Sequence, residues 1–374
     1  MLFRDVVGQE DIKRRLLAET HTGRIPHALM FCGPAGSGKL PLALAYARYL
    51  LCESPSETDA CGVCPACRMT QNYAHPDLHF SFPVVRYKDA ERSVSDVYLD
   101  KWREQLTRSP YFDLADWLAD MEAGNQQAMI YAAESDAIQK RLSLKSSQGG
   151  RKVLVMRWPE KMRVECANKL LKLIEEPPVG TVFLLVSETP DKVLPTILSR
   201  TQSIRVPALE QGILEQALIT RHHLRPEEAG LPARLACGSY TAAVKALTVN
   251  NESALFFDLF VMLMRLSYQR NIKEMRKWSE RIAAMGRERQ KDFLAYCQRL
   301  IRENFIYNFH REELTYQTPE ENNFSKNFAR FVNERNIIPI MEELSAAERD
   351  IEQNTNPKMV FFDFALKMIV LLIQ

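Results

Sequence analysis

The sequence has no long hydrophobic run and almost no net charge. No stretch of about 18 apolar residues is present to span a bilayer, and the first residues lack the apolar core of a secretion signal. Lys plus Arg number 49 against 47 Asp plus Glu, so the formal charge of +2 excludes a global basic field for nucleic acid. Low-complexity tracts and internal repeats are also missing, which argues against linker-dominated and solenoid architectures. We therefore expect a soluble, cytoplasmic protein.

The apolar content is that of a globular chain with well-developed cores. Apolar residues make up 46% of the 374 residues and charged residues 26%, and at about 150 residues per domain this length predicts two or three domains. The most apolar segment, residues 359–373, is interrupted by Asp363 and Lys367. Their i, i+4 spacing predicts an ion pair on one face of a largely buried amphipathic helix, rather than a membrane segment.

Short apolar runs alternate with helical patterns up to about residue 207. This order predicts a parallel sheet with crossover helices. Strands are expected at 28–32, 78–82, 153–156, 181–187 and 203–206, and helices at 9–20, 39–51, 134–145, 163–175 and 192–199. In the clearest helix, one core-facing stripe is formed by Ala167, Leu170, Leu171 and Ile174.

Two further regions follow, and one segment interrupts the sheet pattern. Strand signals end near residue 208, which predicts a small helical domain at 208–249, with a helix starting at Gly238-Ser239, and an all-helical domain at 250–374. Residues 84–128 separate two core strands and carry short helical patterns near 94–106 and 113–121. We expect this insertion to be a surface decoration that Trp102 and Trp117 pin to the sheet domain.

A candidate phosphate-binding loop lies between the first expected strand and the helix after it. Residues 33–39 read GPAGSGK, and such a loop binds phosphate through backbone N–H groups, the helix N-terminus and the lysine ammonium. The candidate ligands are Gly33, Gly36, Ser37, Gly38 and Lys39. Ser or Thr should follow to bind Mg²⁺, but the next residue is Leu40. The loop could therefore hold ATP without hydrolysing it, or it could be an empty turn.

The acidic residues that hydrolysis needs are absent from their expected place. In P-loop hydrolases a second strand ends in carboxylates that hold the metal and polarise water. Here the strand at 153–156 is followed by Arg157 and Trp158, and Pro159 ends the strand before Glu160. We therefore do not expect a hydrolytic centre within this chain.

Four of the eight cysteines are clustered: Cys52, Cys61, Cys64 and Cys67. Without an export signal this clustering favours metal over disulfides, and four thiolates are the number that a closed, structural Zn²⁺ site needs. Reduced thiols without metal and an iron–sulfur centre are the alternatives. His75 and His79 lie nearby and could replace a ligand, although His75-Pro76-Asp77 is more simply a turn.

Several strings, in this order, resemble the bacterial clamp-loader AAA+ family. They are DVVGQ at 5–9, RIPHA at 24–28, the four-cysteine segment, NKLLK at 168–172, EEPP at 175–178 and LSR at 198–200. The resemblance covers residues 1–248 apart from the insertion, and is fainter beyond. It implies an α/β P-loop AAA+ domain with a parallel sheet at 1–207 and a zinc-binding module at 52–67. A small helical lid domain at 208–249 and an all-α collar domain at 250–374 would follow.

The resemblance also implies a role for one arginine. Clamp loaders are five-subunit machines that open a sliding clamp and place it on primed DNA, and their ATP sites are completed by an arginine from the neighbour's Ser-Arg-Cys motif. That motif reads Ser199-Arg200-Thr201 here, so Arg200 is the implied catalytic residue, acting in trans as an arginine finger. A second family arginine, in the lid, corresponds to Thr241. The chain thus lacks what its own site needs and keeps what a neighbour's site needs.

The resemblance therefore implies a non-hydrolysing component of the DNA polymerase III holoenzyme, located at the replisome. Its implied partners are the motor subunits, the delta subunit and, through the complex, the sliding clamp and primed DNA, with no membrane partner. The alternatives are an ATP-hydrolysing motor subunit and a zinc-stabilised DNA-binding scaffold. The scaffold alternative rests on residues 265–302, which contain eleven Lys and Arg against four Asp and Glu and could contact DNA phosphates. Such basic runs are, however, usually solvated helix faces.

Overall fold

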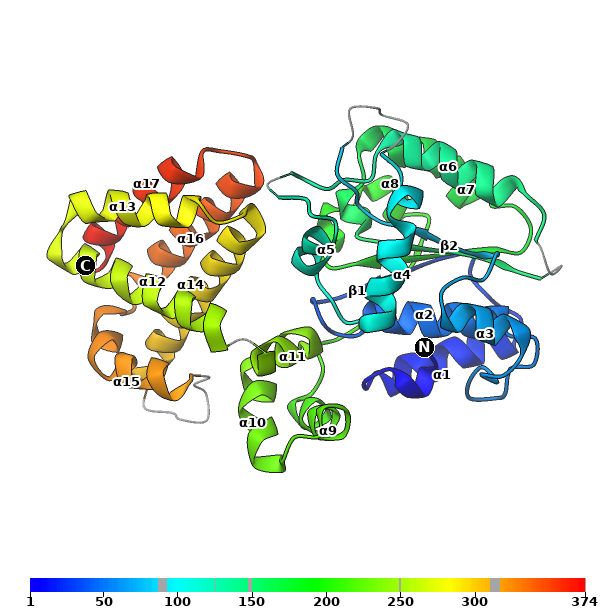
Figure 1. Cartoon of the computed structure of the whole chain (residues 1–374), viewed down its shortest axis with the longest axis horizontal. Coiled ribbons are helices and arrows are strands. Elements are labelled where there is room, and N and C mark those ends of the chain that lie inside the picture. The colour runs from blue at the N-terminus through cyan, green and yellow to red at the C-terminus, as the bar shows by residue number, and fades with distance from the viewer. Residues whose placement is uncertain (87–92, 125, 147–149, 249, 310–316, 374) are drawn as a thin grey trace. The chain divides into compact units, whose positions relative to one another are not determined.

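The computed structural model describes residues 1–86, 93–124, 126–146, 150–248, 250–309 and 317–373. These residues form two compact units, 1–244 and 245–374 (Figure 1). The first unit contains the sheet, and the second contains helices only among the residues described.

The sheet of the first unit has five parallel strands in the order β2-β3-β4-β1-β5. The strands are β1 Ala28–Cys32, β2 Leu78–Ser81, β3 Lys152–Arg157, β4 Thr181–Ser187 and β5 Gln202–Arg205. All five expected strands are confirmed, to within one residue at each end. The interiors of the central strands β1, β3 and β4 are apolar because both of their faces are covered, as is usual for parallel sheets.

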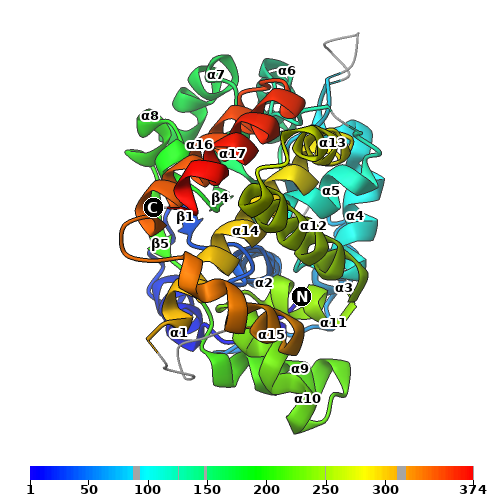
Figure 2. The same ribbon diagram turned by 90° about the vertical axis from the view of Figure 1, so that its left-hand side faces the viewer.

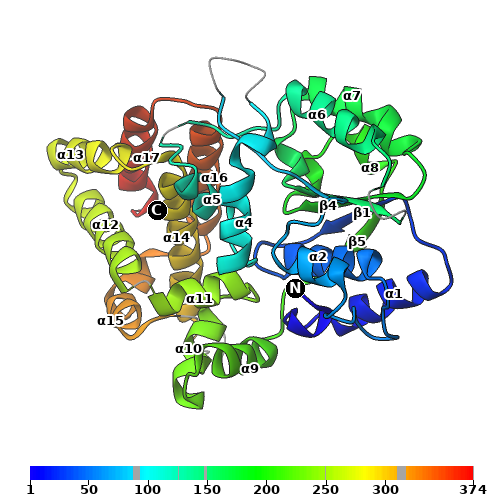
Figure 3. The ribbon, with the colours of Figure 1, turned by 45° about the vertical axis from the view of Figure 1, so that its right-hand side comes forward.

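Helices cover the two faces of the sheet in separate layers (Figure 3). One layer contains α1 Glu10–His21, α2 Lys39–Leu51 and α3 Pro65–Gln71, and the other contains α6 Ala132–Ser143 and α7 Val164–Glu175. Alternate residues of β1 serve the two cores, with Leu29 and Phe31 on the α2 side and Met30 on the α7 side. The predicted stripe of α7 is confirmed, although Leu171 is only partly buried.

The helix expected at 192–199 is shorter than predicted. A single 3-10 turn, Pro190–Lys192, is followed by α8, which spans only Pro195–Leu198. Pro195 has no backbone N–H and disfavours the helical conformation at Leu194, so a helix can begin at this proline but cannot run through it. The result is a short helix that ends immediately before Ser199 and Arg200.

The insertion belongs to the hydrophobic core, which corrects the expected surface decoration. Its described part contains a 3-10 turn at Ser95–Tyr98 and the helices α4 Leu99–Arg108 and α5 Leu114–Asp120. Trp102 and Trp117 are fully buried with ring centroids 4.9 Å apart, and the Trp117 indole N–H donates to the Pro83 carbonyl at 2.9 Å. The two tryptophans therefore pin the insertion, as predicted, by joining the core on the α2 side of the sheet.

Three helices follow the sheet: α9 Gln211–His222, α10 Pro226–Leu235 and α11 Tyr240–Thr248. The predicted start at Gly238-Ser239 is confirmed, because α11 begins directly after Ser239. Residues up to Val244 belong to the first compact unit. The start of α11 therefore packs with the sheet-containing part of the chain.

The second unit is a bundle of helices (Figure 2). Its helices are α12 Asn250–Gln269, α13 Ile272–Ala283, α14 Arg287–Tyr307, α15 Pro319–Phe328, α16 Ile337–Glu352 and α17 Pro357–Leu371. Its core contains Phe260, Trp278, Phe293 and Phe361, all buried. The predicted ion pair of α17 is present, with Lys367 Nζ 2.9 Å from Asp363 Oδ2. Among the described helices, none has the length and hydropathy needed to cross a bilayer.

Candidate functional site

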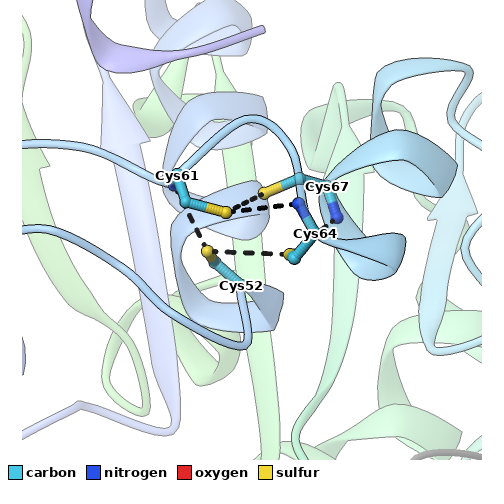
Figure 4. A group of neighbouring side chains, drawn as sticks. All are labelled: Cys52, Cys61, Cys64 and Cys67. Carbon is cyan, nitrogen blue, oxygen red and sulfur yellow. Dashed lines mark hydrogen bonds between the residues drawn. The ribbon is translucent and has the colours of Figure 1, made fainter.

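The four clustered cysteines meet at the junction of α2 and α3 (Figure 4). Cys52 caps the C-terminus of α2, Cys61 lies in the connecting loop, and Cys64 and Cys67 lie at the N-terminus of α3. All four Sγ atoms lie within 4.8 Å of one another. Backbone N–H groups point at the sulfurs, as from Cys64 to Cys61 Sγ at 3.4 Å. The loop therefore presents four sulfurs to one point.

The spacing of the sulfurs fits a tetrahedral metal site. Four ligands at the Zn–S distance of about 2.3 Å lie roughly 3.8 Å apart at the corners of a tetrahedron. Here the Sγ atoms of Cys52 and Cys64 are 4.0 Å apart and those of Cys61 and Cys67 are 3.9 Å apart. The cluster could therefore bind a metal such as zinc.

The two nearby histidines are not part of this cluster. His75 is buried and forms the predicted turn, in which its Nδ1 accepts a hydrogen bond from the Asp77 backbone N–H at 3.1 Å. His79 lies within β2, where burial is the main cause that lowers its pKa to about 4. A four-cysteine donor set without histidine is therefore what the structure presents.

The candidate phosphate loop has the context that the sequence predicts. Residues 33–38 connect β1 to α2, and Gly38 is the residue before the first helical turn. Gly36 and Gly38 have φ values of +72° and +89°, a region that residues with a side chain rarely adopt. Leu40 is buried in the hydrophobic core, so no hydroxyl is present where a Mg²⁺ ligand would be.

Lys39 is turned back into its own loop. Its side chain is 2% exposed, and its Nζ donates hydrogen bonds to the Pro34 carbonyl and, at 3.4 Å, to Ser37 Oγ. Burial, followed by the positive charge of Arg157, lowers the pKa of Lys39 to about 8. The lysine thus binds acceptors of the loop, and is not extended toward a phosphate.

The end of β3 carries a cation and an aromatic ring in place of two carboxylates. Arg157 is buried, pairs with Glu188 and lies with its guanidinium carbon 4.4 Å from the centroid of the Trp158 ring. Glu160 lies in the turn after β3, where its Oε1 accepts a hydrogen bond from the Glu188 backbone N–H at 3.0 Å. The sequence analysis did not identify Glu188, although its place directly after β4 was a usable signal.

The start of α11 packs directly against the loop. The Tyr240 backbone N–H donates to the Gly36 carbonyl at 3.0 Å, and a Cβ added to Gly36 would lie 1.9 Å from Ser239 Oγ. Thr241, at the position of the second family arginine, is buried in the first turn of this helix. The contact requires glycine at position 36, and Thr241 has no positive charge to offer a phosphate.

Arg200 lies away from these loop contacts, at the end of α8. Its Nε donates to Glu175 Oε2 at 3.0 Å and its Nη1 to the Thr196 carbonyl at 3.1 Å, and its side chain remains 32% exposed. Two of the strings behind the family resemblance, EEPP and LSR, therefore meet in one ion pair. The guanidinium is held at the surface. Its hydrogen-bond partners Glu175, Thr196 and Ser199 lie outside residues 33–39.

Comparison with known proteins supports the family resemblance that the sequence shows. A protein-family model described as "DNA polymerase III, delta subunit" matches residues 8–210. The chain belongs to this family. A DNA polymerase III subunit delta' of Pseudomonas aeruginosa is 35% identical over 174 residues, which are 46% of this chain and 41% of that protein. A subunit delta' of Bacillus subtilis is 26% identical over 262 residues, which are 70% of this chain and 66% of that protein.

Relatives with another subunit name match as well. A DNA polymerase III subunit gamma/tau of Mycobacterium tuberculosis is 30% identical over 199 residues, which are 53% of this chain and 27% of that protein. The expected membership in the clamp-loader family is thus confirmed, while each of these matches spans less than two thirds of the relative. The choice between the two kinds of subunit depends on the residues of the site.

A solved structure of a gamma subunit-related protein from Thermotoga maritima aligns with 97% of this chain and 99% of its own, at 14% identity and a TM-score of 0.40. At that level of likeness it says nothing about function.

Proposed function

We propose that this chain is a delta'-like subunit of the DNA polymerase III clamp loader, which does not hydrolyse ATP and donates Arg200 in trans to a neighbouring ATPase site. The observation that carries the proposal is the contrast between two places in the first unit. At the loop, Leu40 is buried in the core and Arg157 pairs with Glu188 where a metal would need free carboxylates. After α8, the Arg200 side chain remains 32% exposed and is positioned by Glu175 and the Thr196 carbonyl.

The chemistry of each place supports this division. A divalent metal at the loop would lack its hydroxyl ligand and would face the positive charge of Arg157, so water would not be activated there. A guanidinium at a neighbour's γ-phosphate stabilises the charge of the transition state, an effect of roughly 10³ to 10⁵ in rate. Arg200 can exchange Glu175 for a phosphate at a small cost in free energy, because such a partly exposed ion pair stabilises a protein by only about 0.2–1 kcal/mol.

The proposal includes a structural zinc ion and a set of partners. Cys52, Cys61, Cys64 and Cys67 would hold Zn²⁺ with no open coordination position, so that the metal stabilises the junction of α2 and α3 and takes no part in catalysis. The partners would be gamma/tau-type motor subunits and the delta subunit and, through them, the sliding clamp and primed DNA in the cytoplasm. DNA contact by residues 265–302 is not needed for this role.

The experiment is to assemble the complex with its motor subunits and to measure loading of the clamp onto primed DNA. Wild type, Arg200→Ala and the control Arg205→Ala, an exposed arginine of β5, are compared after assembly has been checked by size exclusion. We expect loading to fail with Arg200→Ala and to persist with the control. Equal loading by all three chains, with assembly intact, would remove the role in trans. ATP turnover by the isolated chain would instead support the motor-subunit alternative.

A further inference from the structure

A tyrosine of the insertion lies beside the candidate phosphate loop. Tyr111 follows α4, and its hydroxyl oxygen accepts a hydrogen bond from the Val7 backbone N–H at 2.8 Å. A Cβ added to Gly38, the last loop residue before α2, would lie 3.7 Å from both Cε1 and the hydroxyl oxygen of Tyr111. The phenol is only 9% exposed, so it is held firmly at the N-terminus of α2.

The same tyrosine contacts the helices that follow the sheet. Its ring lies edge-on to the Tyr240 ring with centroids 4.6 Å apart, and the Arg221 guanidinium carbon lies 5.9 Å from the centroid of Tyr111 and 5.6 Å from that of Tyr240. Aromatic pairs of this geometry, and cations placed near their rings, attract one another. Arg221 also donates to the Asp5 carbonyl. The insertion, the N-terminal segment, α9 and α11 therefore meet at Tyr111.

These residues also separate the loop from an open pocket of about 760 Å³. Tyr111, Tyr240, Arg221 and His222 are among the residues that line this pocket, whereas no residue of 33–39 is. His222 Nε2 and the Tyr240 hydroxyl are 3.1 Å apart, which fixes the Tyr240 ring in the pocket wall. The loop is thus covered by Ser239 and Tyr240 at Gly36 and by Tyr111 at Gly38.

The residues present do not fit a bound nucleotide. Phosphates on a loop of this kind lie over the N-terminus of the following helix, and Gly38 is the residue immediately before that helix, so a nucleotide bound here would need the space beside Gly38. That space holds the Tyr111 ring, which has the flat shape and the stacking surface of a base. Lys39, which would bind the terminal phosphates, is bound to Pro34 and Ser37.

We propose that Tyr111 acts as a built-in substitute for a nucleoside: it keeps nucleotide off residues 33–39 and clamps α11 against the loop. The insertion would then have a function of its own, which is to close a loop whose catalytic residues are missing. This proposal does not depend on Arg200, because the contacts of Tyr111 and the loop that support it do not include that residue.

The test uses the full chain, a fluorescent ATP analogue and hydrogen–deuterium exchange. We expect wild type and Tyr111→Phe, which keeps the ring, to show no saturable binding at millimolar ATP. Tyr111→Ala should bind the analogue, and the amides of the loop and of the start of α11 should exchange roughly tenfold faster in this variant. Adding ATP to Tyr111→Ala should restore their protection, because the nucleoside then fills the vacated space.

Two results would overturn the proposal. One is a wild-type chain that binds the analogue as tightly as Tyr111→Ala does, which would show that the ring does not compete with nucleotide. The other is a Tyr111→Ala chain with the circular dichroism spectrum of wild type that neither binds the analogue nor exchanges faster at α11. In that case the insertion would not be what closes the loop.

Discussion

At the scale of single residues, the ion pairs of Arg141 with Glu134 and of Arg200 with Glu175 show how burial decides what an arginine does. Arg141 pairs with Glu134, whose side chain is 2% exposed, and with Asp96. Arg200 pairs with Glu175, whose side chain is 56% exposed. Water screens the second pair and cannot reach most of the first, so only the second can be exchanged for another partner at small cost.

We therefore predict opposite effects on stability. Arg141→Met leaves the Glu134 carboxylate buried without its cation and should lower the free energy of unfolding by roughly 3–5 kcal/mol. Arg200→Ala should lower it by no more than about 1 kcal/mol. Urea unfolding followed by circular dichroism measures both. A large loss for Arg200→Ala would mean that this arginine is structural, and that its variant is not a clean probe of function.

Lys39 gives a prediction about pH. Burial lowers its pKa to about 8 in the folded chain, against 10.5 for a solvated lysine. Below pH 8 the lysine is charged in both the folded and the unfolded chain, so burying its charge lowers the free energy of unfolding by the full amount. Between pH 8 and 10.5 the unfolded chain binds more protons, so this group makes stability rise with pH. A shift of this size corresponds to something on the order of 3 kcal/mol.

The measurement compares wild type with Lys39→Met by urea unfolding at pH 7 and pH 10. The variant should gain stability relative to wild type at pH 7, and that relative gain should shrink at pH 10, because wild type then no longer buries a charge. Other titrating groups are common to both chains and cancel in the difference. If the free energies of unfolding of the two chains changed with pH in parallel, Lys39 would not be a buried ammonium with a lowered pKa.

At the scale of elements, the junction of α2 and α3 combines an irregular loop, held by hydrogen bonds from Phe3, Tyr49 and Ala66, with the four-cysteine cluster. Residues 53–59 are mostly exposed and form no helix or strand, and Val63 at the tip of the loop is 69% exposed. Four thiolates gathered around one point repel one another unless a cation neutralises them. The junction should therefore depend on its metal.

We predict about one zinc ion per chain and a loss of stability when the site is broken. Cys64→Ser should lose the metal and unfold at a lower temperature, whereas Cys237→Ser, at an exposed cysteine outside the cluster, should retain both metal and stability. Elemental analysis and thermal unfolding, with and without a strong chelator, provide the readouts. A metal-free chain of unchanged stability would contradict the zinc site.

The elements that the sequence predicts well are those whose cause is local. The central strands β1, β3 and β4 have apolar interiors that are buried on both faces. The four cysteines are close together in the sequence, so a short segment is enough to bring their sulfurs together. The expected helix at 192–199 is too long for a local reason as well, since a proline such as Pro195 favours the first position of a helix. These features need no knowledge of the rest of the chain.

The features that were missed depend on contacts between distant residues. Tyr111 lies 104 residues from Val7, and Glu188 lies 31 residues from Arg157. The insertion was expected to be a decoration because its two tryptophans do not reveal which core they enter. Local patterns cannot supply such pairings, because the fold of the sheet has to bring the partners together first.

At the scale of the whole molecule, the proposed role divides the work of ATP hydrolysis between this chain and a neighbouring subunit. The family match covers residues 8–210, which contain the loop, the cysteine cluster and Arg200. Within that span the loop is closed by its own chain, while Arg200 remains available at the surface. Such a chain would contribute to catalysis only when a neighbour supplies the nucleotide.

The most direct measurement is the ATP turnover of motor subunits, together with the delta subunit, as this chain is titrated into the mixture. We expect no turnover by the isolated chain, stimulation by the wild-type chain, and a loss of roughly 10³-fold or more at the neighbouring site with Arg200→Ala. Equal stimulation by wild type and Arg200→Ala, or hydrolysis by the isolated chain that Lys39→Ala abolishes, would contradict the proposed role.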